Sequence, residues 1–213
     1  MNRLKLSIFT ASTLLALSTM VSAAMDVQTV QTQWAKIKYA TPENQREDAF
    51  EKLVEAIESE APQHRKDAEF LAWQGIVLST YAGEKGGLGA LGVVKKARKA
   101  LEASLEVDPT ALNGSAYTSL GALYYQVPGW PVGFGDDDKA KEYLEKGLSL
   151  NPNGIDSNYF YAEYLFEQKE YQHAQQRLAM ALAAPPRANR EDADRGRREE
   201  IAELQARIER KMN

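Results

Sequence analysis

Residues 115–186 read SAYTSLGALYYQVPGWPVGFGDDDKAKEYLEKGLSLNPNGIDSNYFYAEYLFEQKEYQHAQQRLAMALAAPP, and one helical unit occurs twice in this stretch. Nineteen residues separate Gly121 from Ala140 in the first copy, and twelve separate Ala162 from Ala174 in the second. The stretch therefore predicts two consecutive helical hairpins, the first with a longer turn. The matching positions are Tyr117, Gly121, Tyr124, Ala140, Leu144 and Pro152 in the first copy and Asn158, Ala162, Leu165, Ala174, Leu178 and Pro186 in the second.

The surplus residues of the first copy form a loop of unusual composition, VPGWPVGFG at residues 127–135. Pro128 and Pro131 stiffen this loop, while its glycines permit positive φ angles and close backbone approach. Trp130 and Phe134 are large apolar side chains that are costly to leave in water. We therefore expect the loop either to fold onto its own hairpin as a plug or to form the lip or lid of a binding site.

The same pattern extends toward the N-terminus. Apolar residues at helical spacing predict a degenerate first hairpin over residues 26–62 and a second over residues 66–109. In the second hairpin Gly75 and Ala97 take the small positions, again with an insertion between them. The third and fourth hairpins cover residues 113–152 and 155–186, so the repeat domain spans residues 24–186.

The C-terminal segment, residues 187–213, is highly charged but keeps one narrow apolar stripe. Ile201, Leu204, Ile208 and Met212 recur at intervals of three and four residues, which is typical of one helical face. A terminal helix of this kind covers the exposed core of the last repeat in a solenoid. A seam that binds a partner helix is the alternative.

The pitch of about 34 residues, with small residues at helix crossings and a terminal proline, resembles the tetratricopeptide repeat (TPR). This resemblance implies an all-α fold: a right-handed α-solenoid of about four helical hairpins plus a C-terminal capping helix. It also implies a protein-binding role. The residues that carry it are Leu120, Gly121, Tyr124, Ala140, Leu144, Leu148, Asn151 and Pro152, then Tyr161, Ala162, Leu165, Ala174, Leu178, Leu182 and Pro186.

A narrower resemblance rests on LYYQVPGWPVGFGD at residues 123–136 and AAPPR at residues 183–187. These segments are similar to exported proteobacterial TPR proteins, which in turn resemble the T component of TRAP-type transporters. That resemblance implies a protein that binds a solute receptor or holds a small apolar ligand. The T components are commonly lipid-anchored through a cysteine, and this sequence of 213 residues contains none.

The first 23 residues have the three-part pattern of a secretory signal peptide. Arg3 and Lys5 precede an apolar run, and Val21-Ser22-Ala23 supplies the small residues of a cleavage site. A retained N-terminal anchor is the alternative. We expect export to the periplasm or to the secreted space, without a lipid anchor because there is no cysteine, and no stable membrane insertion after cleavage.

The composition leaves little material for catalysis or for nucleic-acid binding. The formal net charge is −4, and no basic stripe with interleaved aromatic residues occurs. The two histidines, His64 and His173, belong to no catalytic or metal-binding spacing. The aspartates at 136–138 favour a helix start over a calcium loop, and the glycines at 86–92 favour a turn over a phosphate cradle. We predict a non-enzymatic protein without cofactor or metal.

Helical spacing also predicts which side chains face the concave groove. If Gly121 and its neighbours pack inward, the groove receives side chains from the other face of the same helix and from the equivalent helix of the next hairpin. Core packing of the aromatic members is the alternative. We predict an interaction module that binds a protein segment or a small apolar ligand, or alternatively a ligand-binding auxiliary of a periplasmic transporter. The candidate binding residues, with the two loop residues, are Thr118, Tyr125, Gln126, Trp130, Phe134, Tyr159, Glu163 and Phe166.

Overall fold

The computed structural model describes residues 25–213, so the predicted signal peptide lies outside the described residues. Within this range the protein is all-α, and its only β-type pairing is a single bridge between Gly129 and Gly135. No helix of the described part combines the length and the apolar character needed to cross a membrane. The helices are α1 (Val27–Ala40), α2 (Glu43–Glu60), α3 (Ala68–Lys85), α4 (Ala90–Val107), α5 (Ser115–Gln126), α6 (Asp137–Leu150), α7 (Ile155–Glu167), α8 (Tyr171–Leu182) and α9 (Glu191–Met212).

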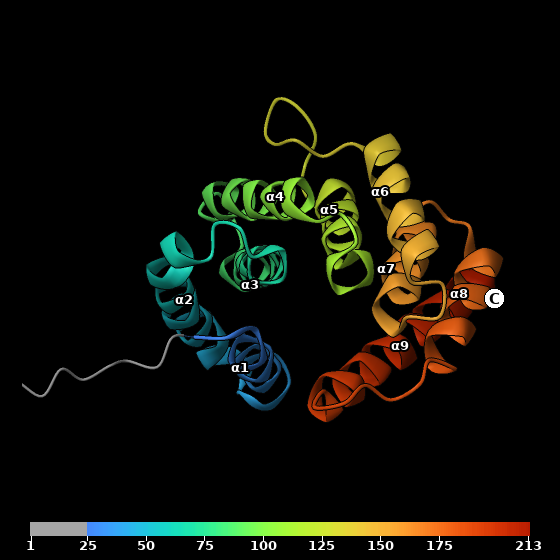
Figure 1. The fold of residues 1–213 in the computed structure, drawn as a ribbon. Helices are drawn as coiled ribbons and strands as arrows, with labels where there is room; N and C mark the ends of the chain where they lie inside the picture. Colours follow the sequence, from blue (N-terminus) through green and yellow to red (C-terminus); the bar gives the residue numbers. More distant parts are fainter. Residues whose placement is uncertain (1–24) are drawn as a thin grey trace, which may run out of the picture.

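The first eight helices form four consecutive hairpins, and α9 follows them as a fifth inner helix (Figure 1). Glycine allows the paired helices of a hairpin to approach closely. A Cβ atom placed on Gly121 would lie 2.5 Å from Cγ of Leu144 on the facing helix, and one placed on Gly75 would collide with Leu101. Ala162 takes the equivalent position in the fourth hairpin and is fully buried. The predicted TPR-like α-solenoid is therefore confirmed.

Aspartate side chains begin three of the helices. Asp26 accepts a hydrogen bond from the backbone N–H of Thr29 at 2.7 Å, and Asp67 accepts one from Phe70 at 3.0 Å. Asp136 does the same for α6, accepting from the N–H of Lys139 at 3.0 Å. Such caps satisfy N–H groups that have no partner inside the helix. The aspartates at 136–138 therefore start a helix, as the sequence predicts.

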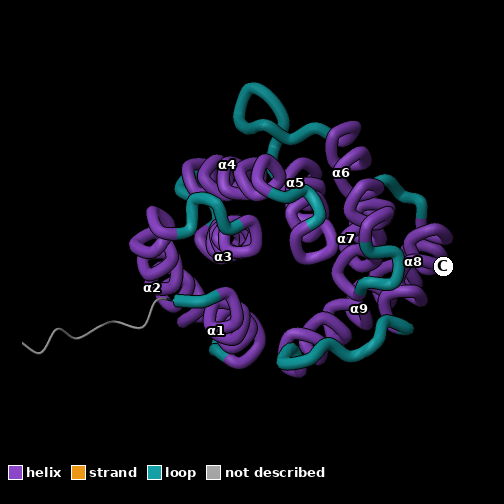
Figure 2. The backbone as a smooth tube through the Cα atoms, viewed as in Figure 1, coloured by secondary structure: helices purple, strands orange, loops and turns teal. Residues whose placement is uncertain are grey.

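The hairpins curve into a ring whose ends meet (Figures 1 and 2). Helices α1, α3, α5, α7 and α9 face the centre, while α2, α4, α6 and α8 lie outside them. The ring closes where α9 contacts α1. There the hydroxyl group of Tyr39 donates to Glu200 at 3.2 Å, and Gly196 leaves room for the Tyr39 ring, which any Cβ at that position would overlap.

The predicted capping role of the last helix is confirmed by its apolar stripe. Ile201, Leu204 and Ile208 are almost completely buried, whereas Met212 at the end of the stripe is exposed. The N-terminal half of α9 is different, because its charged residues Asp194 and Arg197 are also buried. This half closes the ring and forms one side of the central cavity.

Candidate functional site

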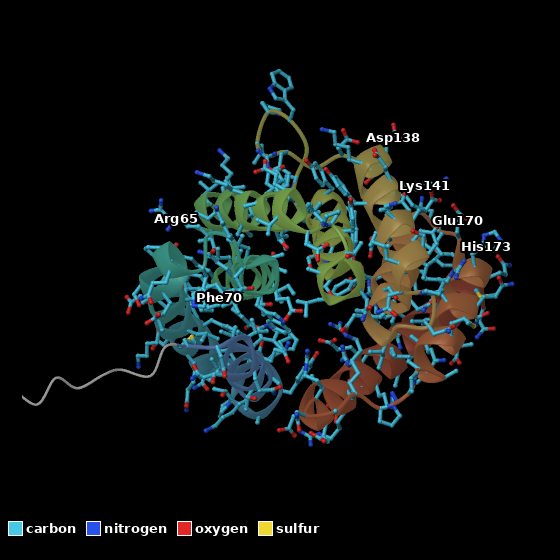
Figure 3. The ribbon with its side chains drawn as sticks, viewed as in Figure 1. Arg65, Phe70, Asp138, Lys141, Glu170 and His173 are labelled. Atoms are coloured by element: carbon cyan, nitrogen blue, oxygen red, sulfur yellow. The ribbon has the colours of Figure 1, made fainter. Side chains whose placement is uncertain are left out.

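A cavity of about 720 Å³ lies inside the ring. All five inner helices contribute side chains to it, and their sticks point toward the centre of the ring in Figure 3. His173 and Glu170, in contrast, lie together on the outer side of the ring (Figure 3), with 2.9 Å between Nδ1 and Oε2. The central cavity is the candidate functional site.

Two tryptophans form an aromatic side of the cavity. The rings of Trp34 on α1 and Trp73 on α3 meet edge to face, with centroids 5.7 Å apart. Trp34 is fixed in orientation because its Nε1–H donates to the Thr80 hydroxyl oxygen at 2.9 Å. A rigid aromatic surface of this kind suits the apolar part of a ligand.

Partly buried ion pairs connect α7 to α9 and to the connection before it. Asp156, in the first turn of α7, accepts from Arg187 Nη1 at 2.6 Å and from Arg197 Nε at 2.8 Å. Arg197 also donates to Glu200 at 2.5 Å, and its guanidinium group stacks on the ring of Tyr159 at 4.4 Å. These contacts fix the N-terminal half of α9 against α7.

Arg187 completes this network from the connection before α9. Its backbone N–H donates to Asp194 at 2.9 Å, and its Nε donates to the other oxygen of the same carboxylate at 2.6 Å. Each carboxylate of the network therefore has a cationic partner, which is the condition for burying such charges.

Glu163 lies farther along α7, and its carboxylate accepts hydrogen bonds only from neutral groups. The donors are the Tyr125 hydroxyl at 2.5 Å, Gln126 Nε2 at 3.2 Å and the Tyr159 hydroxyl at 3.4 Å. Among the described residues no lysine, arginine or histidine nitrogen lies within 4.0 Å of this carboxylate. Burial and the Glu163 carboxylate raise the pKa of Tyr125 well above its usual value, so Tyr125 remains a donor.

Arg190 is a second charged residue of the cavity that has no oppositely charged group within ion-pair distance among the described residues. Its guanidinium group lies over the Trp73 ring at 4.9 Å, and its buried Nε has no hydrogen-bond partner within the described chain. No carboxylate of residues 25–213 forms an ion pair with it. Burial and the nearby Arg187 cation lower the pKa of Arg190, and the Asp156 and Asp194 carboxylates offset this only in part.

The structure brings together four of the predicted binding residues. Thr118 and Gln126 on α5 and Tyr159 and Glu163 on α7 line the central cavity. Tyr125 does not line it but holds the Glu163 carboxylate in place. The spacing that places Gly121 against the partner helix turns this other face toward the ring centre.

The remaining three predicted residues lie away from the cavity. Phe134 packs edge to face on Tyr124 at 5.4 Å and lies under the Arg98 guanidinium group at 4.4 Å. Trp130 is 89% exposed at the loop, and Phe166 is buried beneath Arg207 at 4.4 Å. The base of the loop therefore packs on its own hairpin and on α4 of the preceding one, while Trp130 neither plugs a groove nor covers the cavity.

The site also contains residues that were not predicted from the sequence, among them Trp34, Trp73, Arg187, Arg190 and Arg197. The tryptophans occupy the inner helices of the first two hairpins, so the reasoning applied to α5 and α7 would have indicated them. The arginines carry no such signal. They occur in a segment of high charge, and only their contacts with α3 and α7 distinguish them from solvated residues.

The Asp156 ion pairs give a prediction for acid stability. Burial by itself would raise the pKa of Asp156, but the Arg197 and Arg187 guanidinium groups outweigh burial and hold this pKa well below its usual range. The stabilisation is therefore complete above about pH 4, the ordinary range of aspartate, and is lost as the pH falls toward the folded-state value. In urea unfolding at about pH 7 and about pH 3, we expect wild type to lose more stability on acidification than Asp156→Asn.

The matched control for this measurement is Asp192→Asn. Asp192 pairs with Arg195 on the exposed side of α9, where its side chain is 60% accessible. We expect this variant to follow the wild-type pH dependence. Equal acid losses in wild type and Asp156→Asn would show that the buried network does not stabilise the ring.

Comparison with known proteins gives no family assignment. No family model matches the chain, and no curated protein matches it significantly. A solved structure of Pseudomonas aeruginosa pilF is similar to this chain, with a TM-score of 0.35 and 17% sequence identity. The similarity covers 85% of this chain and 88% of that chain.

Proposed function

We propose that this protein is a non-enzymatic binding module that holds a small ligand or a short chain segment in its central cavity. The central cavity of about 720 Å³ supports this function, because ligand sites typically measure about 300–1,000 Å³. Its surface combines the rings of Trp34 and Trp73 with a few fixed polar groups, including Glu163 and Arg190. Such a surface suits a ligand of mixed polarity.

The charged groups of the cavity support binding over catalysis. Asp156, Arg187, Arg197 and Glu200 satisfy one another in ion pairs. Neither histidine of the chain lines the cavity, and residues 25–213 contain no cluster of three or more potential metal ligands. Under this proposal these groups keep the ring rigid and orient the ligand.

A second candidate function is that of a ligand-binding auxiliary of a periplasmic transporter. A solute carrier requires a cavity for its ligand, and the ring has one. Trp130 does not lie over this cavity, so in this function the ligand would be covered by another segment or by a partner. Export to the periplasm is part of both proposals and rests on the sequence of residues 1–23.

The test is to fill the cavity from one side. Ser119 lies on the cavity face of α5, whereas Ser59 is exposed on the outer helix α2. Native mass spectrometry of protein purified from its natural source should show a bound species in wild type and in Ser59→Trp, and none in Ser119→Trp. In a thermal-shift screen, a ligand at about 100 times its Kd should raise Tm by roughly 5–10 °C.

The screen should contain metabolites and short peptides. Retention of the bound species by Ser119→Trp would place the site elsewhere. A wild-type protein that carries no bound species and is stabilised by no member of the screen would contradict the proposed function. A stoichiometric protein partner whose binding survives Ser119→Trp would also contradict it, because that partner would use the outer surface.

A further inference from the structure

We propose that the ligand is a short, free peptide of about three residues, held by its two charged ends. Its C-terminal carboxylate binds Arg190, and its N-terminal ammonium group binds Glu163. This inference rests on the proposed function, since it specifies the ligand of the same cavity. It follows from two charged groups of opposite sign that line one cavity and that form no ion pair with any described residue.

Arg190 is prepared to receive a carboxylate. Trp73 supports one face of its guanidinium group at 4.9 Å, which fixes the plane in which the nitrogen atoms donate. Arginine has five N–H donors arranged to match a carboxylate; the Nε of Arg190 is itself buried, and no ion pair with a described residue occupies its Nη groups. Arg187 and Arg197, by comparison, are occupied by Asp156, Asp194 and Glu200.

Glu163 is prepared to receive an ammonium group. Three neutral donors, Tyr125, Gln126 and Tyr159, hold its carboxylate without neutralising its charge. A carboxylate oxygen has two acceptor positions, so the group can still accept from a cation. Glu163 forms no ion pair with any described residue, so an ammonium group of the ligand would be its cationic partner.

The separation between the two groups sets the length of the ligand. Arg187 binds Asp156 at 2.6 Å, and the backbone N–H of Arg190 donates to the Arg187 carbonyl at 3.3 Å, so Arg190 begins near the level of Asp156 on α7. Glu163 is seven residues farther along the same helix, which corresponds to about 10 Å at a rise of about 1.5 Å per residue. An extended peptide of three residues spans about 10 Å.

The surface between the two ends suits the middle of a peptide. Ile76, Ala122 and the ring of Tyr159 provide apolar contacts for a central side chain. Ser119 and Gln126 line the same cavity and carry groups that can hydrogen-bond to peptide amides. A purely apolar ligand would leave these groups and both charges without partners, at a cost in affinity.

The experiment uses a pool of tripeptides with alanine at both ends and each common amino acid at the centre. Three forms of the pool are compared by native mass spectrometry: both ends free, the N-terminus acetylated, and the C-terminus amidated. The strongest binder is then measured by calorimetry in each form. We expect each blocked end to weaken binding about tenfold or more, as for the loss of a charged hydrogen bond.

Two variants assign the ends. Arg190→Gln should lower the affinity for the free peptide about tenfold and leave the affinity for the amidated peptide nearly unchanged. Glu163→Gln should lower the affinity for the free peptide by a similar factor and leave the affinity for the acetylated peptide nearly unchanged. The matched controls are Arg195→Gln and Glu199→Gln on the exposed side of α9, which should bind like wild type. The Tm of each variant without peptide shows whether it is folded.

Binding that does not depend on the peptide ends would overturn the inference. The inference would also fail if Arg190→Gln and Glu163→Gln lowered the affinities for the free and the blocked peptides equally. If no member of the pool binds while another ligand is lost from Ser119→Trp, the inference is wrong and the proposed function stands. If Ser119→Trp retains every ligand found, the proposed function itself fails.

Discussion

Replacing Arg197 by methionine lowers the free energy of unfolding by about 3 kcal/mol, as expected when one partner of a buried ion pair is removed. Methionine keeps an apolar stem between the rings of Tyr159 and Phe160, which the guanidinium group contacts at 4.4 and 4.6 Å. It removes the charge that Asp156 and Glu200 share. Glu200 is then left with the Tyr39 hydroxyl as its donor.

Urea unfolding followed by circular dichroism measures this loss. The control is Arg195→Met, two residues earlier on the same helix, where the side chain is 57% exposed. We expect this variant to stay within about 0.5 kcal/mol of wild type. Similar losses in the two variants would mean that Arg197 acts only through helix propensity and that the buried network contributes nothing.

Gly121→Leu is the second substitution with a large expected effect. It should lower the free energy of unfolding by about 3 kcal/mol, at the upper end of the usual range for overpacking. A Cβ atom at this position would lie 2.5 Å from Leu144 Cγ and 3.0 Å from the Leu144 backbone nitrogen. The Leu144 side chain can rotate away, but its backbone cannot, so α5 and α6 must separate. Thermal unfolding should show Tm lowered by roughly 6–12 °C.

Gly92→Leu is the control for this substitution. A Cβ atom placed on Gly92 in α4 would meet no atom of another helix within 4 Å, so leucine enters open space. We expect the stability of this variant to be unchanged or raised by up to about 1 kcal/mol, because glycine disfavours helix. An unchanged Tm in Gly121→Leu would show that the repeat register is wrong.

The hairpins could be predicted from sequence because their determinants are local. Gly75 and Gly121 each face a leucine of the partner helix, and a fixed spacing places the same contact in successive hairpins. The ring closure has no such signature. Tyr39 and Glu200 are 161 residues apart in sequence, and the periodicity of single hairpins does not specify the curvature that brings them together.

The candidate site was predictable only in part, for the same reason. Thr118, Gln126, Tyr159 and Glu163 follow from helical periodicity once the packed face is known. Arg190 could not be found in this way, because its role depends on its position over Trp73, which is distant in sequence. Composition alone drew attention to the loop at 127–135, although its residues lie outside the cavity.

The contact between the first and last helices also constrains how such a protein can evolve. An open array can gain or lose a unit at its end, because each repeat touches only its neighbours. Here an added or deleted hairpin would move α9 away from α1 and separate Gly196 from the Tyr39 ring that fits against it. We therefore expect homologues that keep this closure to vary in turn length and cavity side chains but to share one copy number.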